Sequence, residues 1–243
     1  MNTVLFITIA TGNYYSKFIP DLYESMVKYF NFDFKLLCLT DDTDTDNNII
    51  KKHIKHAKWP YSTLMRYHHI LHYVEDIKKY DFIFYIDSDM KICDYISYSD
   101  IVSSRVGILH PGFYHSVRSE FTYETNKKSK AYIKSDEGTH YYQGCLHGGY
   151  RETFLDMCNT IKNNIDEDLK RNIIALWHDE SHLNRYFIDN PPSLSLSPDF
   201  AVPENWIGVK KEWIQESNCW NILYETTTPK IIHLEKNHKE IRQ

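Results

Sequence analysis

Two aspartates separated by one residue follow directly on an apolar run. The segment Phe82–Ile86 leads into Asp87, Ser88 and Asp89. In an extended chain, residues two apart point the same way, so both carboxylates face one side. Two such acids repel each other and are costly to desolvate unless a cation or hydrogen-bond donors neutralise them. Carboxylate oxygens suit Mg²⁺ or Mn²⁺ shared with a substrate phosphate; the alternative is a solvated turn capped by Asp87.

A second candidate for chemistry lies in the segment Trp177–Asn184. His178 and His182 are four residues apart, so on a helix they would share one face, which is the geometry of a zinc site. The zincin pattern requires Glu directly after the first histidine, and Asp179 stands there instead. Asp179 and Glu180 also suit the first turn of a helix through its dipole. A zinc hydrolase is therefore one hypothesis, and an ordinary helix start is the other.

The C-terminal segment, residues 230–243, carries several basic side chains. Lys236 and Arg242 could fold over a diphosphate, because cations stabilise a leaving phosphate. The alternative is a frayed, solvated tail. Spacing alone does not choose between the two.

The elements that must position these residues alternate along the chain. Short runs rich in β-branched and aromatic residues predict strands at Val4–Ile9, Phe34–Leu39, Phe82–Ile86, Val106–Leu109 and Lys230–Leu234. Apolar residues at spacings of three and four predict two amphipathic helices, over Phe18–Phe30 and Leu64–Val74. This alternation predicts a mainly parallel sheet, and ligands bind beyond the carboxyl ends of such strands.

Composition limits the classes of function. The 243 residues suit one α/β domain, and no repeat or linker divides them. Hydrophobic residues make up 42% and charged residues 25%, so the chain folds around a core. The net charge of −5 argues against a general nucleic-acid binder, and an anionic ligand needs a local cluster of cations. Aromatic residues reach 15%, which suggests a well-buried core or a stacking surface.

Neither the N-terminus nor the cysteines indicate a secreted protein. The apolar start, Val4–Ile9, lacks a basic leader region and is far shorter than the ~20 residues of a membrane helix. The 5 cysteines are odd in number and share no C-x-x-C spacing, which predicts reduced thiols. We therefore expect a soluble, cytoplasmic protein without a membrane anchor.

Six sequence blocks, in the same order and at near-constant spacing, resemble the glycosyltransferases of the blood-group A/B transferase and alpha-1,3-galactosyltransferase family (family 6). The blocks are Leu109–Tyr114, Phe121–Glu124, Ala131–Ile133, Asp136–Gly138, Tyr141–Tyr142 with Gly148–Gly149, and Trp177–Asn184. Gly148 and Gly149 are expected to allow close backbone packing rather than chemistry. The resemblance implies a GT-A fold, a Rossmann-like sheet flanked by helices, as a single catalytic domain over residues 1–243. The resemblance divides this domain into a nucleotide-sugar-binding half at about 1–105 and an acceptor and catalytic half at about 106–243.

The resemblance implies a retaining hexosyltransferase that moves galactose or a related hexose from a UDP-sugar to an oligosaccharide acceptor in alpha-1,3-type linkage. N-acetylgalactosamine and glucose are the alternative donor sugars. Asp87 and Asp89 match the D-x-D motif that binds Mn²⁺, with Mg²⁺ as the alternative, and through it the diphosphate. The chain resembles the soluble bacterial and phage members, several of which carry asparagines here, so its two acids predict metal dependence. The other implied donor contacts are Ile9, Ala10, Thr11, Tyr14, Arg66, Ser88, Gln143, Gly144, Cys145, Asp179, Lys236 and Arg242.

The resemblance also assigns the reaction centre. Glu180 stands where the family has its candidate nucleophile, and Tyr14 is the expected stacking ring for uracil. Retention requires Glu180 either to form a covalent glycosyl intermediate or to stabilise the cation during front-face transfer. Acceptor contacts are implied for His110, Thr122, Trp177 and Glu180. A non-catalytic carbohydrate-binding protein is the competing hypothesis, but mere binding needs neither the paired acids nor Glu180.

The triplet Gln143–Gly144–Cys145 departs from the family pattern. It occupies the stretch that separates galactose users from N-acetylgalactosamine users, and the latter carry a Gly where Cys145 stands. The larger Cys145 side chain favours, on steric grounds, a donor with an unsubstituted C2 hydroxyl, whereas Gln143 fits neither pattern. Pro203, next to Glu204, falls where relatives have an acceptor-binding acid, so their fucosylated acceptor is not expected here.

Overall fold

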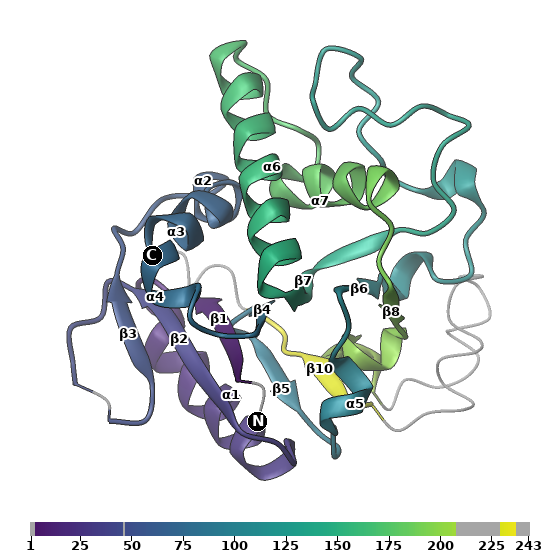
Figure 1. Cartoon of the computed structure of the whole chain (residues 1–243). Helices are drawn as coiled ribbons and strands as arrows, with labels where there is room; N and C mark the ends of the chain where they lie inside the picture. Colours follow the sequence, from purple (N-terminus) through teal and green to yellow (C-terminus); the bar gives the residue numbers. More distant parts are fainter. Residues whose placement is uncertain (1–2, 46, 208–228, 237–243) are drawn as a thin grey trace.

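A seven-stranded sheet forms the centre of the computed structural model, which describes residues 3–45, 47–207 and 229–236 (Figure 1). Its strands are β1 (Val4–Ile9), β2 (Phe34–Thr40), β3 (Ile50–His53), β4 (Phe82–Ile86), β6 (Arg105–Leu109), β7 (Tyr142–Tyr150) and β8 (Leu194–Leu196). They lie in the order β3-β2-β1-β4-β7-β6-β8. Only β7 runs antiparallel to its neighbours, β4 and β6. The predicted α/β fold with a mainly parallel sheet is therefore confirmed.

Helices cover both faces of this sheet. They are α1 (Tyr14–Tyr29), α2 (Tyr61–Leu64), α3 (Arg66–His72), α4 (Val74–Ile77), α5 (Tyr98–Ile101), α6 (Arg151–Lys170) and α7 (His178–Asp189), with 3₁₀ turns at Pro111–Phe113, Arg118–Glu120, Pro198–Phe200 and Glu204–Trp206. Along β1, Val4 and Phe6 join an apolar cluster with α1, whereas Leu5 and Ile7 join a second cluster with α3, α6 and α7. Two apolar clusters, one on each face, explain why β1 is apolar at nearly every position.

A second, three-stranded sheet lies beside the first. It consists of β5 (Met90–Ile92), β10 (Ile231–His233) and β9 (Val202–Pro203), with β10 in the middle. β10 runs antiparallel to β5 and places His233 opposite Met90. The amide of Leu234 then donates to the carbonyl of Asp89 at 2.8 Å. This pairing brings the C-terminal part of the chain against the aspartate pair.

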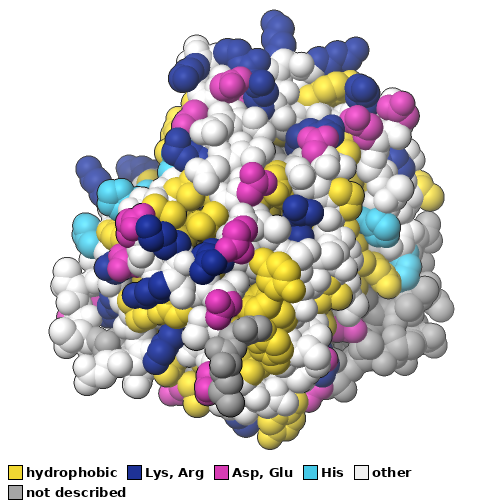
Figure 2. All heavy atoms as spheres, viewed as in Figure 1, with side chains coloured by type: hydrophobic (Ala, Val, Ile, Leu, Met, Phe, Trp, Pro, Cys, Tyr) yellow, Lys and Arg dark blue, Asp and Glu magenta, His cyan; other side chains and the backbone are white. Residues whose placement is uncertain are grey.

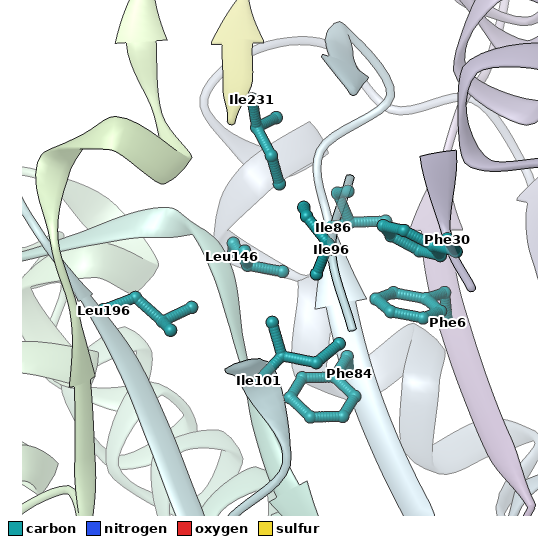
Figure 3. A pocket seen from close by; sticks show the side chains of 9 residues that line it. All are labelled: Phe6, Phe30, Phe84, Ile86, Ile96, Ile101, Leu146, Leu196 and Ile231. Atoms are coloured by element: carbon teal, nitrogen blue, oxygen red, sulfur yellow. The ribbon is translucent and has the colours of Figure 1, made fainter. Parts of the chain in front are cut away.

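The apolar cluster on the α1 face encloses a small void. It measures about 10 Å³ and is lined only by apolar side chains, among them Phe6, Phe84 and Ile231 (Figure 3). An apolar space of this size offers a water molecule no hydrogen-bond partner. It is therefore a packing imperfection of the core and not a binding site.

The predicted helix over Leu64–Val74 is divided into α2, α3 and α4. The backbone leaves the helical conformation at Met65 and Tyr73, yet Leu64, Tyr67 and Ile70 still pack into one cluster. The apolar spacing survives because all three short helices bury the same face. The prediction of one continuous helix is wrong, whereas the predicted buried face is right.

Strand β7 was missed because glycine is depleted in strands. A Cβ atom on Gly148 would lie 2.4 Å from the carbonyl oxygen of Ile83 on β4, and Gly149 has φ +143. Both glycines therefore permit close strand packing, as predicted: a larger residue would force β7 away from β4 at Gly148 and away from the start of β6 at Gly149.

On the face drawn in Figure 2, acidic and basic side chains are interspersed rather than gathered into a patch of one sign. This face offers a polyanion no extended basic surface. Among the described helices, none combines the length and the apolar composition needed to cross a bilayer.

Candidate active site

Three strand ends meet where the chemistry is expected. β1 and β4 are parallel neighbours, so their carboxyl ends lie at one edge of the sheet, and antiparallel β7 begins at that edge. The amide of Asp87 donates to the carbonyl of Cys145 at 2.8 Å, which ties the aspartate pair to β7. The register between β6 and β7 shifts at Gly107 and Ile108, so residues 144–146 have no paired partner on β6. The amide of Gly144 is thereby free to bind a side chain.

One pocket of about 560 Å³ opens at this edge. Eight of the residues that the resemblance assigns to the donor line it: Ile9, Thr11, Tyr14, Arg66, Asp87, Ser88, Asp89 and Lys236. Thr11 shares a hydrogen bond of 2.9 Å with His56, another lining residue. Ala10 lies behind the lining, with its amide bonded to Leu39. The volume is that of an ordinary small-molecule site.

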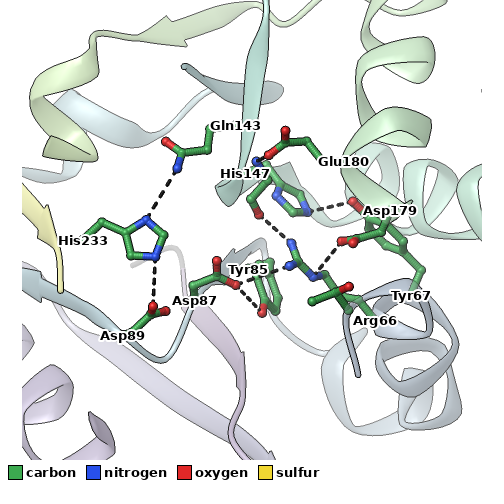
Figure 4. Close-up of polar contacts among 12 residues, drawn as sticks. Arg66, Tyr67, Tyr85, Asp87, Asp89, Gln143, His147, Asp179, Glu180 and His233 are labelled. Carbon is green, nitrogen blue, oxygen red and sulfur yellow. Dashed lines mark hydrogen bonds and ion pairs between the residues drawn. The ribbon is translucent and has the colours of Figure 1, made fainter. Parts of the chain in front are cut away.

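Arg66, at the start of α3, is the central cation of the site. Its Nη1 donates to the carbonyl of Gly144 at 2.5 Å, its Nη2 lies 3.3 Å from Asp87, and its Nε lies 3.1 Å from Asp179 (Figure 4). The guanidinium also lies 4.0 Å from the ring centroid of Tyr85. Arg66 is only 5% exposed. These contacts therefore hold one positive charge between the carboxylates of Asp87 and Asp179, largely shielded from solvent.

Asp87, Asp89 and His233 form a group whose ligating atoms all lie within 4.8 Å of one another. His233 Nε2 is 2.9 Å from Asp89, and the Lys236 ammonium contacts the same carboxylate oxygen. Burial would raise the pKa of Asp89, but the His233 imidazole and the Lys236 ammonium outweigh it and lower that pKa. The carboxylate is therefore ionised at neutral pH. Two carboxylates and an imidazole fit a divalent cation.

Glu180, in the first turn of α7, lies on the other side of Arg66. Its Oε2 accepts the Gly144 amide at 2.8 Å, and its Oε1 accepts the Tyr141 hydroxyl at 3.1 Å. Burial raises the pKa of Glu180 to about 7 and that of neighbouring Asp179 to about 6. These two acids therefore titrate near neutrality, in the range where an acid can exchange protons or act as a nucleophile.

The three residues of the β7 triplet lie differently. A Cβ atom on Gly144 would lie 3.4 Å from Arg66 and 3.5 Å from Glu180, so Gly144 faces the reaction centre. Gln143 lies beside His233, with 3.5 Å between Nε2 and Nδ1. Cys145 is 2% exposed and packs in the apolar cluster of the α1 face. The Cys145 side chain therefore points away from the pocket. The expectation that its size favours a donor with an unsubstituted C2 hydroxyl is not supported.

Three of the residues assigned to the acceptor, His110, Thr122 and Glu180, lie next to Tyr141. His110 packs edge-on against the Tyr141 ring with centroids 5.5 Å apart, and Thr122 interacts with the Tyr141 hydroxyl. Burial lowers the pKa of His110 to about 4, so its imidazole is neutral. Trp177, directly before α7, is 47% exposed and offers a flat apolar face. Arg242, expected over the diphosphate, lies outside the described residues.

The zinc hypothesis fails on geometry. His182 is 1% exposed with Nε2 3.7 Å from Asp168, whereas His178 packs edge-on against Trp59. In the described part of the chain, no group of three metal-ligating side chains includes either histidine. The two rings therefore have separate structural surroundings.

Sequence reasoning missed three side chains of the site: His233, Tyr85 and Tyr141. Tyr85 precedes the aspartate pair by two residues and donates its hydroxyl to Asp87 at 2.7 Å. That spacing could have indicated the contact, because residues i and i+2 of a strand share a face. His233 and Tyr141 reach the site only through pairing of distant segments.

Comparison with known proteins decides the family. The family model described as Glycosyltransferase family 6 matches residues 2–216. The chain belongs to glycosyltransferase family 6. This family 6 chain is 37% identical over 143 residues to the rat histo-blood group ABO system transferase 1, covering 59% of the chain and 37% of that protein. It is 28% identical over 201 residues to the O-antigen biosynthesis glycosyltransferase WbnI of Escherichia coli, covering 78% and 79%.

A third relative of this family 6 chain is the human globoside alpha-1,3-N-acetylgalactosaminyltransferase 1. It is 38% identical over 95 residues, which cover 39% of the chain and 27% of that protein. The chain spans 37% and 39% of the lengths of the two rat relatives it matches. The names of these relatives include both blood-group and O-antigen enzymes, so family membership does not by itself choose a sugar or an acceptor.

Proposed function

We propose that the protein is a metal-dependent retaining hexosyltransferase that transfers galactose or a related hexose from a UDP-sugar to a glycan acceptor in alpha-1,3-type linkage. The observation that carries the proposal is the position of Glu180. Its carboxylate lies beside Gly144 and Arg66, next to the pocket that also holds Asp87 and Asp89. A buried acid next to a pocket that carries two further carboxylates and two cations is what glycosyl transfer requires and mere sugar binding does not.

The donor half of the proposal follows from the pocket lining. Tyr14 offers a ring for uracil, and Ile9 and Thr11 provide the floor at the end of β1. Asp87 and Asp89 would hold Mn²⁺, or Mg²⁺ as the alternative. A divalent ion there would neutralise the diphosphate and stabilise UDP as the leaving group.

The reaction breaks the bond between the anomeric carbon and the phosphate oxygen, and the electron pair leaves with UDP. Arg66 and Lys236, which both line the pocket, stabilise the growing negative charge. Glu180 faces the positive charge that develops on the sugar ring. In one course it bonds to the anomeric carbon, and the acceptor hydroxyl then breaks that bond by attacking from the side that UDP has left. In the other course it stabilises the cation while the acceptor hydroxyl attacks from that same side. In both courses the departing phosphate oxygen takes up the proton of the hydroxyl.

Choice of sugar rests on Gln143 and Gly144. Gly144 faces Arg66 and Glu180, and Gln143 lies beside His233, in the stretch at which the resemblance separates galactose users from N-acetylgalactosamine users. We propose galactose as the donor sugar because the family resemblance implies it, with N-acetylgalactosamine and glucose as the alternatives that a donor panel separates. His110, Thr122 and Trp177 would form the acceptor side.

The test is release of UDP from a panel of UDP-sugars, with Mn²⁺, with Mg²⁺ and with EDTA. We expect fastest release from UDP-galactose with Mn²⁺ and loss of turnover in EDTA. Asp89→Asn should reduce turnover at least about tenfold, whereas Asp21→Asn, an exposed acid on α1, should not. Turnover that survives EDTA would remove the metal role, and absence of release from every UDP-sugar would favour a carbohydrate-binding protein.

A further inference from the structure

His233 is held beside the aspartate pair by backbone pairing. β10 places it opposite Met90 of β5, and the next amide, that of Leu234, bonds to the carbonyl of Asp89. The pairing of β10 with β5 therefore fixes the backbone position of His233, whatever its side chain does. Only a rotamer choice remains, and the imidazole points at the carboxylates (Figure 4).

The side chain has the reach of a metal ligand. His233 Nε2 lies 2.9 Å from Asp89 Oδ2, and with an oxygen of Asp87 the three ligating atoms lie within 4.8 Å of one another. Ligands on one Mg²⁺-sized ion with bonds of about 2.1 Å lie at most about 4.2 Å apart. Small side-chain movements would therefore bring all three onto a single ion.

The far side of the imidazole carries a second, independent observation. Nδ1 lies 3.5 Å from the amide of Gln143, whose Oε1 is buried without a partner in the described part of the chain. An imidazole that binds metal through Nε2 carries its proton on Nδ1 and needs an acceptor there. Rotation of the Gln143 amide would supply that acceptor, because its oxygen and nitrogen exchange places.

The oxygen of Asp89 that faces His233, Oδ2, already binds one cation, the Lys236 ammonium. A divalent ion bound at that oxygen would displace the ammonium and leave it free for a donor phosphate. Lysine cannot ligate a metal while it is charged, so the ligand set consists of the two aspartates and the histidine.

We propose that His233 is the third protein ligand of the divalent cation, so that Asp87, Asp89 and His233 bind it before the UDP-sugar arrives. The inference rests on the proposed metal-dependent function and adds a residue to it. It also has a chemical consequence, because an imidazole ligand favours transition metals over Mg²⁺. The site should therefore prefer Mn²⁺ to Mg²⁺ more strongly than two carboxylates would.

The test uses Mn²⁺ alone, with the full chain and no UDP-sugar. Titration followed by the electron paramagnetic resonance signal of free Mn²⁺ gives the affinity, and pulsed measurements detect coupling of bound Mn²⁺ to an imidazole nitrogen. We expect that coupling in the wild type. His233→Ala should abolish it and weaken Mn²⁺ binding about tenfold or more, with a smaller loss for Mg²⁺. His72→Ala, an exposed histidine at the end of α3, is the control and should change neither.

The outcomes separate this inference from the function on which it rests. Bound Mn²⁺ without nitrogen coupling, or an unchanged affinity in His233→Ala, would overturn the role of His233 while Asp89→Asn could still show the metal site to be real. Failure of the wild type to bind Mn²⁺ with or without UDP would overturn both. The coupling in the wild type needs no variant, so the test holds even where His233→Ala fails to fold.

Discussion

Two carboxylates of the site are almost equally buried and yet differ in pKa. Asp89 is 2% exposed and Asp179 is 3% exposed. The pKa of Asp89 is lowered because His233 and Lys236 outweigh the effect of burial, whereas burial raises the pKa of Asp179 to about 6 despite Arg66. Burial alone therefore does not decide the pKa of a carboxylate here; its hydrogen-bonding and positively charged partners decide it as well.

The same contrast separates the two ends of the pocket. At the Asp87–Asp89 end, His233 and Lys236 hold the pKa of Asp89 below its usual range. At the other end, the Glu180 carboxylate accepts hydrogen bonds from the Gly144 amide and the Tyr141 hydroxyl, and its pKa rises to about 7. Arg66 lies between the ends and contacts both. The first arrangement suits holding a cation and a diphosphate, and the second suits a group that reacts.

The largest expected effect comes from removing the charge at the reacting end. Glu180→Gln keeps the size of the side chain but cannot bear a negative charge toward the sugar. We expect transfer to fall about a hundredfold or more, with UDP affinity near that of the wild type. Steady-state rates and calorimetric UDP binding measure the two quantities.

The control for this prediction is Glu152→Gln, an exposed acid on α6. It should alter neither rate nor affinity. Unchanged turnover in Glu180→Gln would mean that Glu180 takes no part in the reaction. The two ends of the pocket would then not differ in role.

The second prediction concerns stability against pH in the absence of metal. The pKa of Glu180 is raised from 4.5 to about 7, so the folded protein holds this proton more tightly than the unfolded chain. Its stabilising contribution is therefore complete below pH 4.5 and is lost as pH rises through about 7. Relative to Glu180→Gln, the free energy of unfolding of the wild type should fall by about 1–3 kcal/mol over that interval.

Denaturant unfolding at a series of pH values, in EDTA, measures this difference. Parallel curves for the wild type and Glu180→Gln would mean that Glu180 has an ordinary pKa in the folded protein. The contrast between the two ends of the pocket would then disappear.

Part of this site could be predicted because it depends on local sequence. The apolar run Phe82–Ile86 fixes a buried strand, and Asp87 and Asp89 then necessarily lie at its carboxyl end. In the same way, the acids two and three residues after Trp177 mark the start of α7 and place Glu180 in its first turn. The family resemblance added roles to positions that the local pattern had already placed.

The remainder depends on pairing between distant segments. Asp89 and His233 are 144 residues apart, and no local pattern links them. The register shift between β6 and β7 turns Cys145 into the core and Gly144 toward Glu180, which reverses the importance expected of these two residues. Such contacts follow from sheet order, which depends on tertiary packing rather than on residue type.

The smallest predicted effects come from two tyrosines that serve the two ends separately. Tyr85 donates to Asp87 and Tyr141 donates to Glu180, and each acid keeps another partner when its tyrosine is changed. Each Tyr→Phe change should therefore cost about 1 kcal/mol, which is about fivefold.

The quantity that changes should differ between the two variants. Tyr85→Phe should weaken binding of Mn²⁺ and UDP with little change in kcat, because its hydroxyl serves a carboxylate that holds the donor. Tyr141→Phe should lower kcat. It should also shift the increase of the rate with pH to a higher pH, because loss of the hydroxyl raises the pKa of Glu180 further. If both variants changed the same quantity, the two ends would act as one unit, and the division of the pocket into a holding end and a reacting end would be wrong.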